Sequence, residues 1–116
     1  MKATELMIGD KVMVKVLSQI PNTYVLHTWT ANDYSRNLQV KPIPLTTEIL
    51  EKNGWEQTEY CHEYQYGKNT IQCRLPYMVG RINGIDIENF KCEYVHQYQH
   101  LLRLCGLDEL ANNFKI

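Results

Sequence analysis

Residues 94–106, YVHQYQHLLRLCG, form the longest stretch of this 116-residue sequence in which apolar residues recur at helical spacing. At about 100° per residue, one broad face collects Tyr94, Val95, Tyr98, Leu101, Leu102 and Cys105. This pattern predicts a helix that is buried along one side, with strands packed on its apolar face. Gly106 follows the last periodic residue and predicts a left-handed helix end, where a Cβ would clash. Asp108 and Glu109 follow too soon to be buried.

A hairpin with a defined register leads into this helix. Its turn is Asn83-Gly84, the preferred pair for a two-residue type I′ turn, because both central residues need positive φ. The turn joins residues 77–82 to residues 85–90 and pairs Ile82 with Ile85, Arg81 with Asp86 and Gly80 with Ile87. One side is then apolar, with Met78, Ile82, Ile85 and Ile87, and the other side carries Arg81, Asp86 and Glu88. An earlier hairpin is expected from residues 60–66 and 70–75, around the turn at residues 67–69.

Residues 1–41 predict three short strands. In residues 5–17 a turn at Gly9-Asp10 precedes Val12, Val14 and Val16, which alternate with other residues as in a half-buried strand. A turn at Pro21-Asn22 leads to a second strand, residues 24–30, and a polar connection, residues 31–37, leads to a third, residues 38–41. Such strands predict a small curled sheet or an SH3-like barrel lobe.

A short helix follows this lobe. Pro42 and Pro44 hold the chain extended and lack the N–H groups needed for sheet pairing, so the first lobe should end there. Thr46 is placed to cap a helix over residues 47–53, and Gly54 can supply its left-handed exit. Leu45 and Leu50 have the spacing of a hydrophobic staple.

Together these elements predict an α+β fold. It consists of an N-terminal small β lobe, a short helix, an antiparallel β meander and a covering C-terminal helix. A chain of 116 residues has the common size of a single domain. We therefore expect one domain over residues 1–116, and a division into two lobes, residues 1–42 and 43–116, stays open.

Composition and charge indicate the cellular compartment and the class of binding partner. The sequence is 44% hydrophobic and 22% charged, which is typical of a folded chain and not of a disordered one. No segment has the apolar length of a signal peptide or a membrane span, so we expect a cytoplasmic protein with no membrane partner. The four cysteines lack zinc-ribbon spacing and are expected to be free thiols. The net charge is −1, with scattered Lys and Arg residues, which disfavours nucleic-acid binding.

Two separated motifs resemble a known group of proteins. Residues 43–55 read IPLTTEILEKNGW and residues 94–107 read YVHQYQHLLRLCGL. The pair resembles small uncharacterised phage- and prophage-type proteins of gut anaerobic bacteria, which share I-P-L-T-x-E-x-L-x-K-N-G before Phe or Trp, and later Y-V-H-x-L-Q-x-L. Tyr98 departs from the leucine usual in the second motif. The resemblance covers about a quarter of the chain and implies a mobile-element setting, with no activity attached to it.

One constellation has metal-ligand spacing. His96 and His100 lie four residues apart on the predicted helix, and Cys92 lies four residues before His96, so the three could share one stripe. Position 97 is Gln, so the glutamate of the H-E-x-x-H motif is missing. A metal-dependent enzyme using Cys92, His96 and His100 is therefore an alternative and not the main hypothesis. The sequence predicts no catalytic residue and no cofactor.

The main hypothesis is a non-enzymatic protein-interaction module of a phage or mobile element, with a protein partner or self-association. The outward stripe of the last helix offers residues that hydrogen-bond specifically, in place of generic Glu and Lys. This predicts a contact surface formed by His96, Gln97, His100 and Arg103. The other reading of the stripe, packing against the N-terminal lobe, stays open. A further alternative is a nucleic-acid-binding module that uses the N-terminal β lobe through Lys11, Lys15, Arg36 and Lys41.

Overall fold

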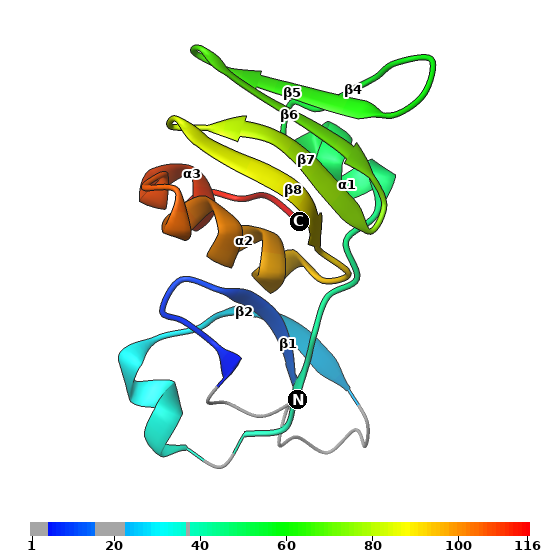
Figure 1. The fold of residues 1–116 in the computed structure, drawn as a ribbon. Coiled ribbons are helices and arrows are strands. Elements are labelled where there is room, and N and C mark those ends of the chain that lie inside the picture. The colour runs from blue at the N-terminus through cyan, green and yellow to red at the C-terminus, as the bar shows by residue number, and fades with distance from the viewer. Residues whose placement is uncertain (1–4, 16–22, 37) are drawn as a thin grey trace.

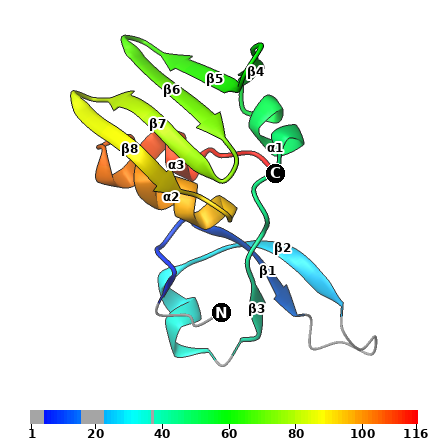
Figure 2. The same cartoon turned by 45° about the vertical axis from the view of Figure 1, so that its right-hand side comes forward.

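The computed structural model describes residues 5–15, 23–36 and 38–116. These residues form two antiparallel sheets, and the two C-terminal helices lie between the sheets (Figures 1 and 2). The chain runs from the small N-terminal sheet, in blue and cyan, through the larger sheet, in green and yellow, to the helices in orange and red. The predicted α+β class is confirmed.

The N-terminal sheet contains β1 (Lys11–Lys15), β2 (Tyr24–Thr28) and β3 (Val40–Lys41), in the order β2-β1-β3. Its core consists of Leu6, Val12, Val14, Trp29 and Val40. Strand β2 ends earlier than predicted because Thr30 leaves the sheet and donates its backbone N–H to Asp33 (2.7 Å), at the start of a 3₁₀ helix, η2 (Ala31–Ser35). The described residues thus form a three-stranded sheet and not an SH3-like barrel. The predicted turn at residues 21–22 and Val16 lie outside the described residues.

Helix α1 (Thr47–Lys52) begins where predicted and ends one residue earlier, with Asn53 as its C-cap. The Oγ1 atom of Thr46 accepts a hydrogen bond from the Ile49 backbone N–H (3.3 Å), so Thr46 is the N-cap. Gly54 has a φ of +90°, which a side chain would disfavour. Leu45 and Leu50 are both buried in the large core, as the staple spacing predicted.

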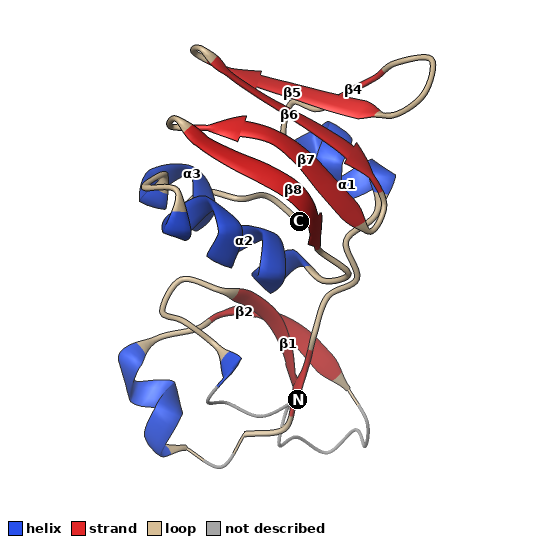
Figure 3. Cartoon of the chain, viewed as in Figure 1, coloured by secondary structure: helices blue, strands red, loops and turns tan. Residues whose placement is uncertain are grey.

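The larger sheet has five strands in sequence order, each antiparallel to the next (Figure 3). They are β4 (Glu56–Gln57), β5 (His62–Tyr66), β6 (Asn69–Arg74), β7 (Tyr77–Ile82) and β8 (Ile85–Lys91). Strand β4 was not predicted, because its two exposed polar residues show no apolar alternation. The turn between β5 and β6 is tighter than expected, since Tyr66 pairs with Asn69 and only Gly67 and Lys68 remain between them.

The Asn83-Gly84 turn has the predicted geometry. Asn83 and Gly84 have φ angles of +50° and +77°, and all three predicted strand pairs are present. Beyond the last of these pairs, Glu88 and Asn89 together oppose one residue of β7, which makes a β-bulge with Asn89 at a φ of +48°. The bulge was not predicted. Ile85 was expected on the apolar side of the hairpin. It lies at the end of the hairpin, is 45% exposed and is not part of the core.

Helix α2 (Val95–Leu104) covers one face of this sheet, followed by α3 (Asp108–Asn112). The apolar face of α2 packs against sheet residues Ile71, Met78 and Ile82 in a common core. Gly106 has the predicted positive φ, +80°. Helix α3 was not predicted; Asp108 and Glu109 are exposed in its first turn.

The two sheets therefore have separate apolar cores, with α2 between them. All four cysteines are unpaired, and Cys73, Cys92 and Cys105 are buried. Within the described ranges, no helix combines the length and apolarity needed to cross a bilayer.

Candidate functional site

The polar stripe of α2 packs against the N-terminal lobe. Asp10, in the turn before β1, is fully buried and accepts hydrogen bonds from His100 Nε2 (2.5 Å) and the Met7 backbone N–H (2.8 Å). The Arg103 guanidinium forms an ion pair with the second oxygen of Asp10. Burial alone would raise the pKa of Asp10, but these hydrogen bonds outweigh it and lower that pKa. The stripe is internal, as in the second reading that the sequence left open.

Gln99 extends the polar joint, which is the contact between α2 and the N-terminal lobe. Its side chain is fully buried; Oε1 accepts the Lys11 backbone N–H (2.8 Å), and Nε2 donates to the Gly9 and Ala111 carbonyls (3.0 and 2.9 Å). A buried amide needs such partners, because an unmet donor or acceptor costs free energy. Gln99 occupies the Gln position of the Y-V-H-x-L-Q-x-L motif, but the motif does not indicate this role, since only the fold brings the hydrogen-bond partners of Gln99 together.

The other two residues of the expected surface also serve the fold. The Oε1 atom of Gln97 accepts the backbone N–H groups of Glu93 and Tyr94 (2.8 and 3.1 Å) at the start of α2. His96 is only 6% exposed and stacks on the Tyr94 ring, and its Nδ1 has no hydrogen-bond partner among the described residues. Burial, and then the neighbouring His100, lower the pKa of His96. Internal packing thus occupies the surface expected at His96, Gln97, His100 and Arg103.

The three residues considered as metal ligands do not share a stripe. Cys92 precedes α2 and is buried in the large core, so it has no helical spacing to His96. The His100 ring is directed at Asp10. Over residues 5–15, 23–36 and 38–116, no group of three His, Cys, Asp or Glu side chains has the arrangement of a metal site.

The four basic residues considered for nucleic-acid binding do not all lie together. Lys11, Lys15 and Lys41 lie on one side of the small sheet, because Lys41 pairs with Met13 between the other two. Lys11 Nζ donates to a threonine hydroxyl (2.6 Å), and Lys41 Nζ lies 4.1 Å from the centre of the Tyr24 ring. Arg36 lies apart, with its guanidinium 3.4 Å from the Asp33 carboxylate.

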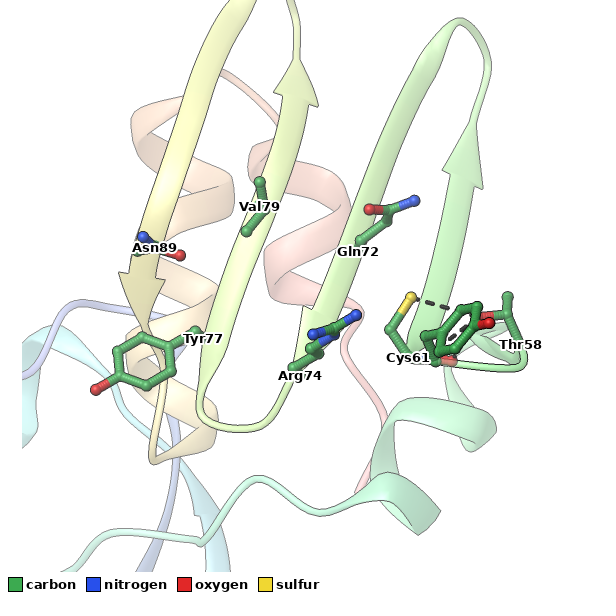
Figure 4. A pocket seen from close by; sticks show the side chains of 8 residues that line it. Thr58, Cys61, Gln72, Arg74, Tyr77, Val79 and Asn89 are labelled. Atoms are coloured by element: carbon green, nitrogen blue, oxygen red, sulfur yellow. Dashed lines mark hydrogen bonds between the residues drawn. The ribbon is translucent and has the colours of Figure 1, made fainter.

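The open face of the large sheet is the candidate site. The helices pack on the opposite face, and Figure 4 views the open face with the helices behind it. Strand register aligns side chains into rows across this face. One row holds Arg74, Tyr77 and Lys91, and the next holds Glu63, Gln72 and Val79.

A hollow of about 480 Å³ lies on this face, where the two rows meet. The side chains that line it are Thr58, Tyr60, Cys61, Gln72, Arg74, Tyr77, Val79 and Asn89. Arg74 lies between Tyr77 and Cys61 in Figure 4. Tyr60, Tyr77 and Val79 are 73%, 45% and 42% exposed, so much of the apolar surface here remains in water. The bulge in β8 contributes Asn89 to the wall.

The chemistry of the hollow is suited to recognition. Three of the four arginines form ion pairs within the described residues, and Arg74 is the fourth. Its guanidinium offers five N–H donors, and the tyrosine rings beside it offer flat apolar surface. The Cys61 sulfur lies 3.3 Å from the Thr58 hydroxyl. The neighbouring His62 interacts instead with Glu51 (3.3 Å), so among the described residues no base contacts the Cys61 thiol.

Sequence reasoning missed this site although part of its signal was visible. The chain has eight tyrosines and two phenylalanines, and the alternation in residues 71–79 separates apolar positions from Gln72, Arg74, Tyr77 and Val79. Which face of the sheet the helices cover depends on tertiary packing, and alternation alone does not determine it.

Comparison of the chain with protein-family models, curated proteins and solved structures found no match.

Proposed function

We propose that this protein is a non-enzymatic interaction module that binds another protein through the open face of its large sheet. One observation carries the proposal: within the described residues this face has no covering element, and it presents exposed Tyr77 and Val79 beside Arg74, which has no ion pair. Protein contact surfaces are enriched in Tyr and Arg. Contiguous exposed apolar surface with a polar rim is typical of such contacts.

The edges of the sheet are poorer candidates than its face. The β8 edge is interrupted by the bulge at Asn89 and carries the charged residues Asp86 and Glu88. Bulges and charges of this kind hinder pairing with a further strand. At the other edge, β4 is only two residues long. A partner is therefore expected to contact side chains of the face and not the backbone of an edge.

The proposed setting is the cytoplasm of a bacterium, in a phage or other mobile element. The resemblance of residues 43–55 and 94–107 to phage- and prophage-type proteins supports the mobile element. Unpaired cysteines, three of them buried, are usual in a reducing compartment. The partner in this proposal is a second protein or a second copy of the chain.

A paired substitution tests the open face. Tyr77 and Tyr66 are both 45% exposed, but they lie on opposite faces of the sheet. Tyr77 shares the open face with its strand partner Arg74, whereas Tyr66 stacks on Tyr64, whose ring packs on Trp55 of the large core. If the partner is another protein, we expect Tyr77→Ser to abolish its co-purification from cells of the native host. If the partner is a second copy of the chain, we expect Tyr77→Ser to abolish self-association measured by sedimentation. Tyr66→Ser should leave both unchanged. A partner retained by Tyr77→Ser, combined with Val79→Ser, would contradict the proposal.

A further inference from the structure

We infer that the hollow around Arg74 anchors an acidic segment of the partner protein. One Asp or Glu carboxylate of that segment pairs with the Arg74 guanidinium, and an apolar side chain next to it packs on Tyr77 and Val79. This inference rests on the proposed function and assigns the chemistry of the partner. Arginine binds carboxylates through two parallel N–H···O bonds, so the anchor is directional as well as charged.

The charge of the hollow selects an anion. None of the eight side chains that line it is acidic, and Arg74 forms no ion pair among the described residues, although Glu59 lies in the wall of an adjoining hollow that Arg74 also lines. Lys91, the other cation of the same row, is held by Glu93 at 2.7 Å. The chain as a whole carries a net charge of −1, so this positive site is local. A carboxylate over Arg74 supplies the missing counter-charge.

The neighbouring row limits the segment to one acid at this point. Glu63 lies across from Gln72, and its carboxylate accepts hydrogen bonds from the side chains of Gln65 (3.1 Å) and Gln72 (3.5 Å). A second acidic residue placed over this row would be repelled by Glu63. Val79 lies in the same row and favours an apolar residue. The matching sequence is therefore one acid next to one apolar residue.

A protein segment fits this face better than single-stranded nucleic acid. Bases could stack on the tyrosines, but a nucleic-acid strand also needs a positively charged groove that follows its phosphates. Arg74 lies at one end of the open face; of the other cations on this face, Lys91 is paired with Glu93 and Arg81 with Asp86, and Glu63 lies in the row next to Arg74. These carboxylates would repel successive phosphates, while a short peptide needs only one anionic contact.

The test uses a displayed library of random twelve-residue peptides, selected on the full-length protein. Enriched peptides are synthesised, their affinity is measured by fluorescence anisotropy, and their site is mapped by shifts of backbone amide NMR signals. A twelve-nucleotide oligothymidylate is measured in parallel. The variants are Arg74→Ala and, as a matched control, Arg81→Ala, because Arg81 lies on the same face but is paired with Asp86.

We expect enriched peptides to share an acid next to an apolar residue, and Arg74→Ala to weaken them at least about tenfold, the loss of one charge-assisted contact. Arg81→Ala should change affinity less than about twofold. Peptides that shift the Tyr77 and Val79 amides but lack an acid, or bind Arg74→Ala equally well, would overturn the acidic anchor and leave the proposed function standing. Selection of no peptide, peptides that map elsewhere, or oligothymidylate binding at Arg74 in their place would overturn both.

Discussion

Asp10 is a carboxylate removed from water, and its ionised form depends on His100 and Arg103. Asp10→Asn keeps the shape of the side chain but leaves the Arg103 guanidinium, which is 13% exposed, without a counter-charge. We expect the free energy of unfolding in urea to fall by about 3–5 kcal/mol, since breaking a buried pair leaves an uncompensated charge. Asp86→Asn breaks a pair whose side chains are 67% and 70% exposed, and should cost less than about 1 kcal/mol. Equal losses would contradict the buried role of Asp10.

His96 should make the stability of the protein depend on pH. Its pKa in the folded state is lowered from the ordinary value of 6.5, so the unfolded chain takes up the proton more readily. The stability due to neutral His96 is therefore complete above pH 6.5 and is lost as pH falls through the lowered folded pKa. The groups that face this ring are His100, Asp10 and Glu5. Asp10 also has a lowered pKa and adds a similar loss in more acidic solution.

Urea unfolding between pH 8 and pH 5 measures this effect. His96→Phe keeps a ring to stack on Tyr94 and removes the titrating group. We expect the decline in unfolding free energy below pH 6.5 to be smaller in His96→Phe than in the unchanged protein. An identical decline in both proteins would assign the pH dependence to other groups.

The roles of some single residues were predicted from the sequence and those of others were not. The difference follows from how far apart in the sequence a residue and its contact partners lie. Thr46, Gly54 and Gly106 were predicted because capping and helix exit depend on residues within one turn. The bond between His100 and Asp10 joins positions ninety residues apart, and no local pattern encodes it. The internal role of the α2 stripe could therefore only be left open from the sequence.

At the scale of elements, the hairpin of β7 and β8 was specified by its turn. The Cβ of a side chain at Gly84 would meet no atom within 4 Å, so substitution there tests the backbone alone. Gly84→Val should lower stability by about 1 kcal/mol or more, because a β-branched residue resists the φ of +77°. Gly84→Asn should cost less, since Asn tolerates positive φ. Thermal melting followed by circular dichroism can compare them, and equal melting temperatures would contradict the strain argument.

The elements missed from the sequence were short or irregular. Strand β4 and helix α3 have two and five residues, too few to show a period of their own. The bulge at Asn89 places a positive φ at a residue that is not glycine, so no glycine marked it. The longer elements with a clear period, β6 to β8 and α2, were predicted with ends correct to within one or two residues.

At the scale of the whole molecule, two apolar cores meet at a polar joint. Gln99 makes hydrogen bonds to both sides of that joint, so Gln99→Leu would leave the Lys11 N–H and the Gly9 and Ala111 carbonyls without this partner. We expect amide hydrogen exchange of β1 to quicken by about tenfold or more, as local opening becomes easier. Amides of β6 and β7 should change much less, because their core does not use Gln99. Equal acceleration in both sheets would show that the lobes open together.

The four thiols also differ in accessibility across the molecule, which makes one of them a natural attachment point for a probe. Burial raises the pKa of Cys73 to about 11 and that of Cys92 to about 12, and it also raises the pKa of Cys105. Thiolates are the reactive form, so these three should react slowly with a maleimide dye in the folded protein. Cys61 is only partly buried and lies in the hollow beside Arg74. Mass spectrometry should find a single dye on Cys61, and its fluorescence would then report arrival of a partner without any engineered cysteine.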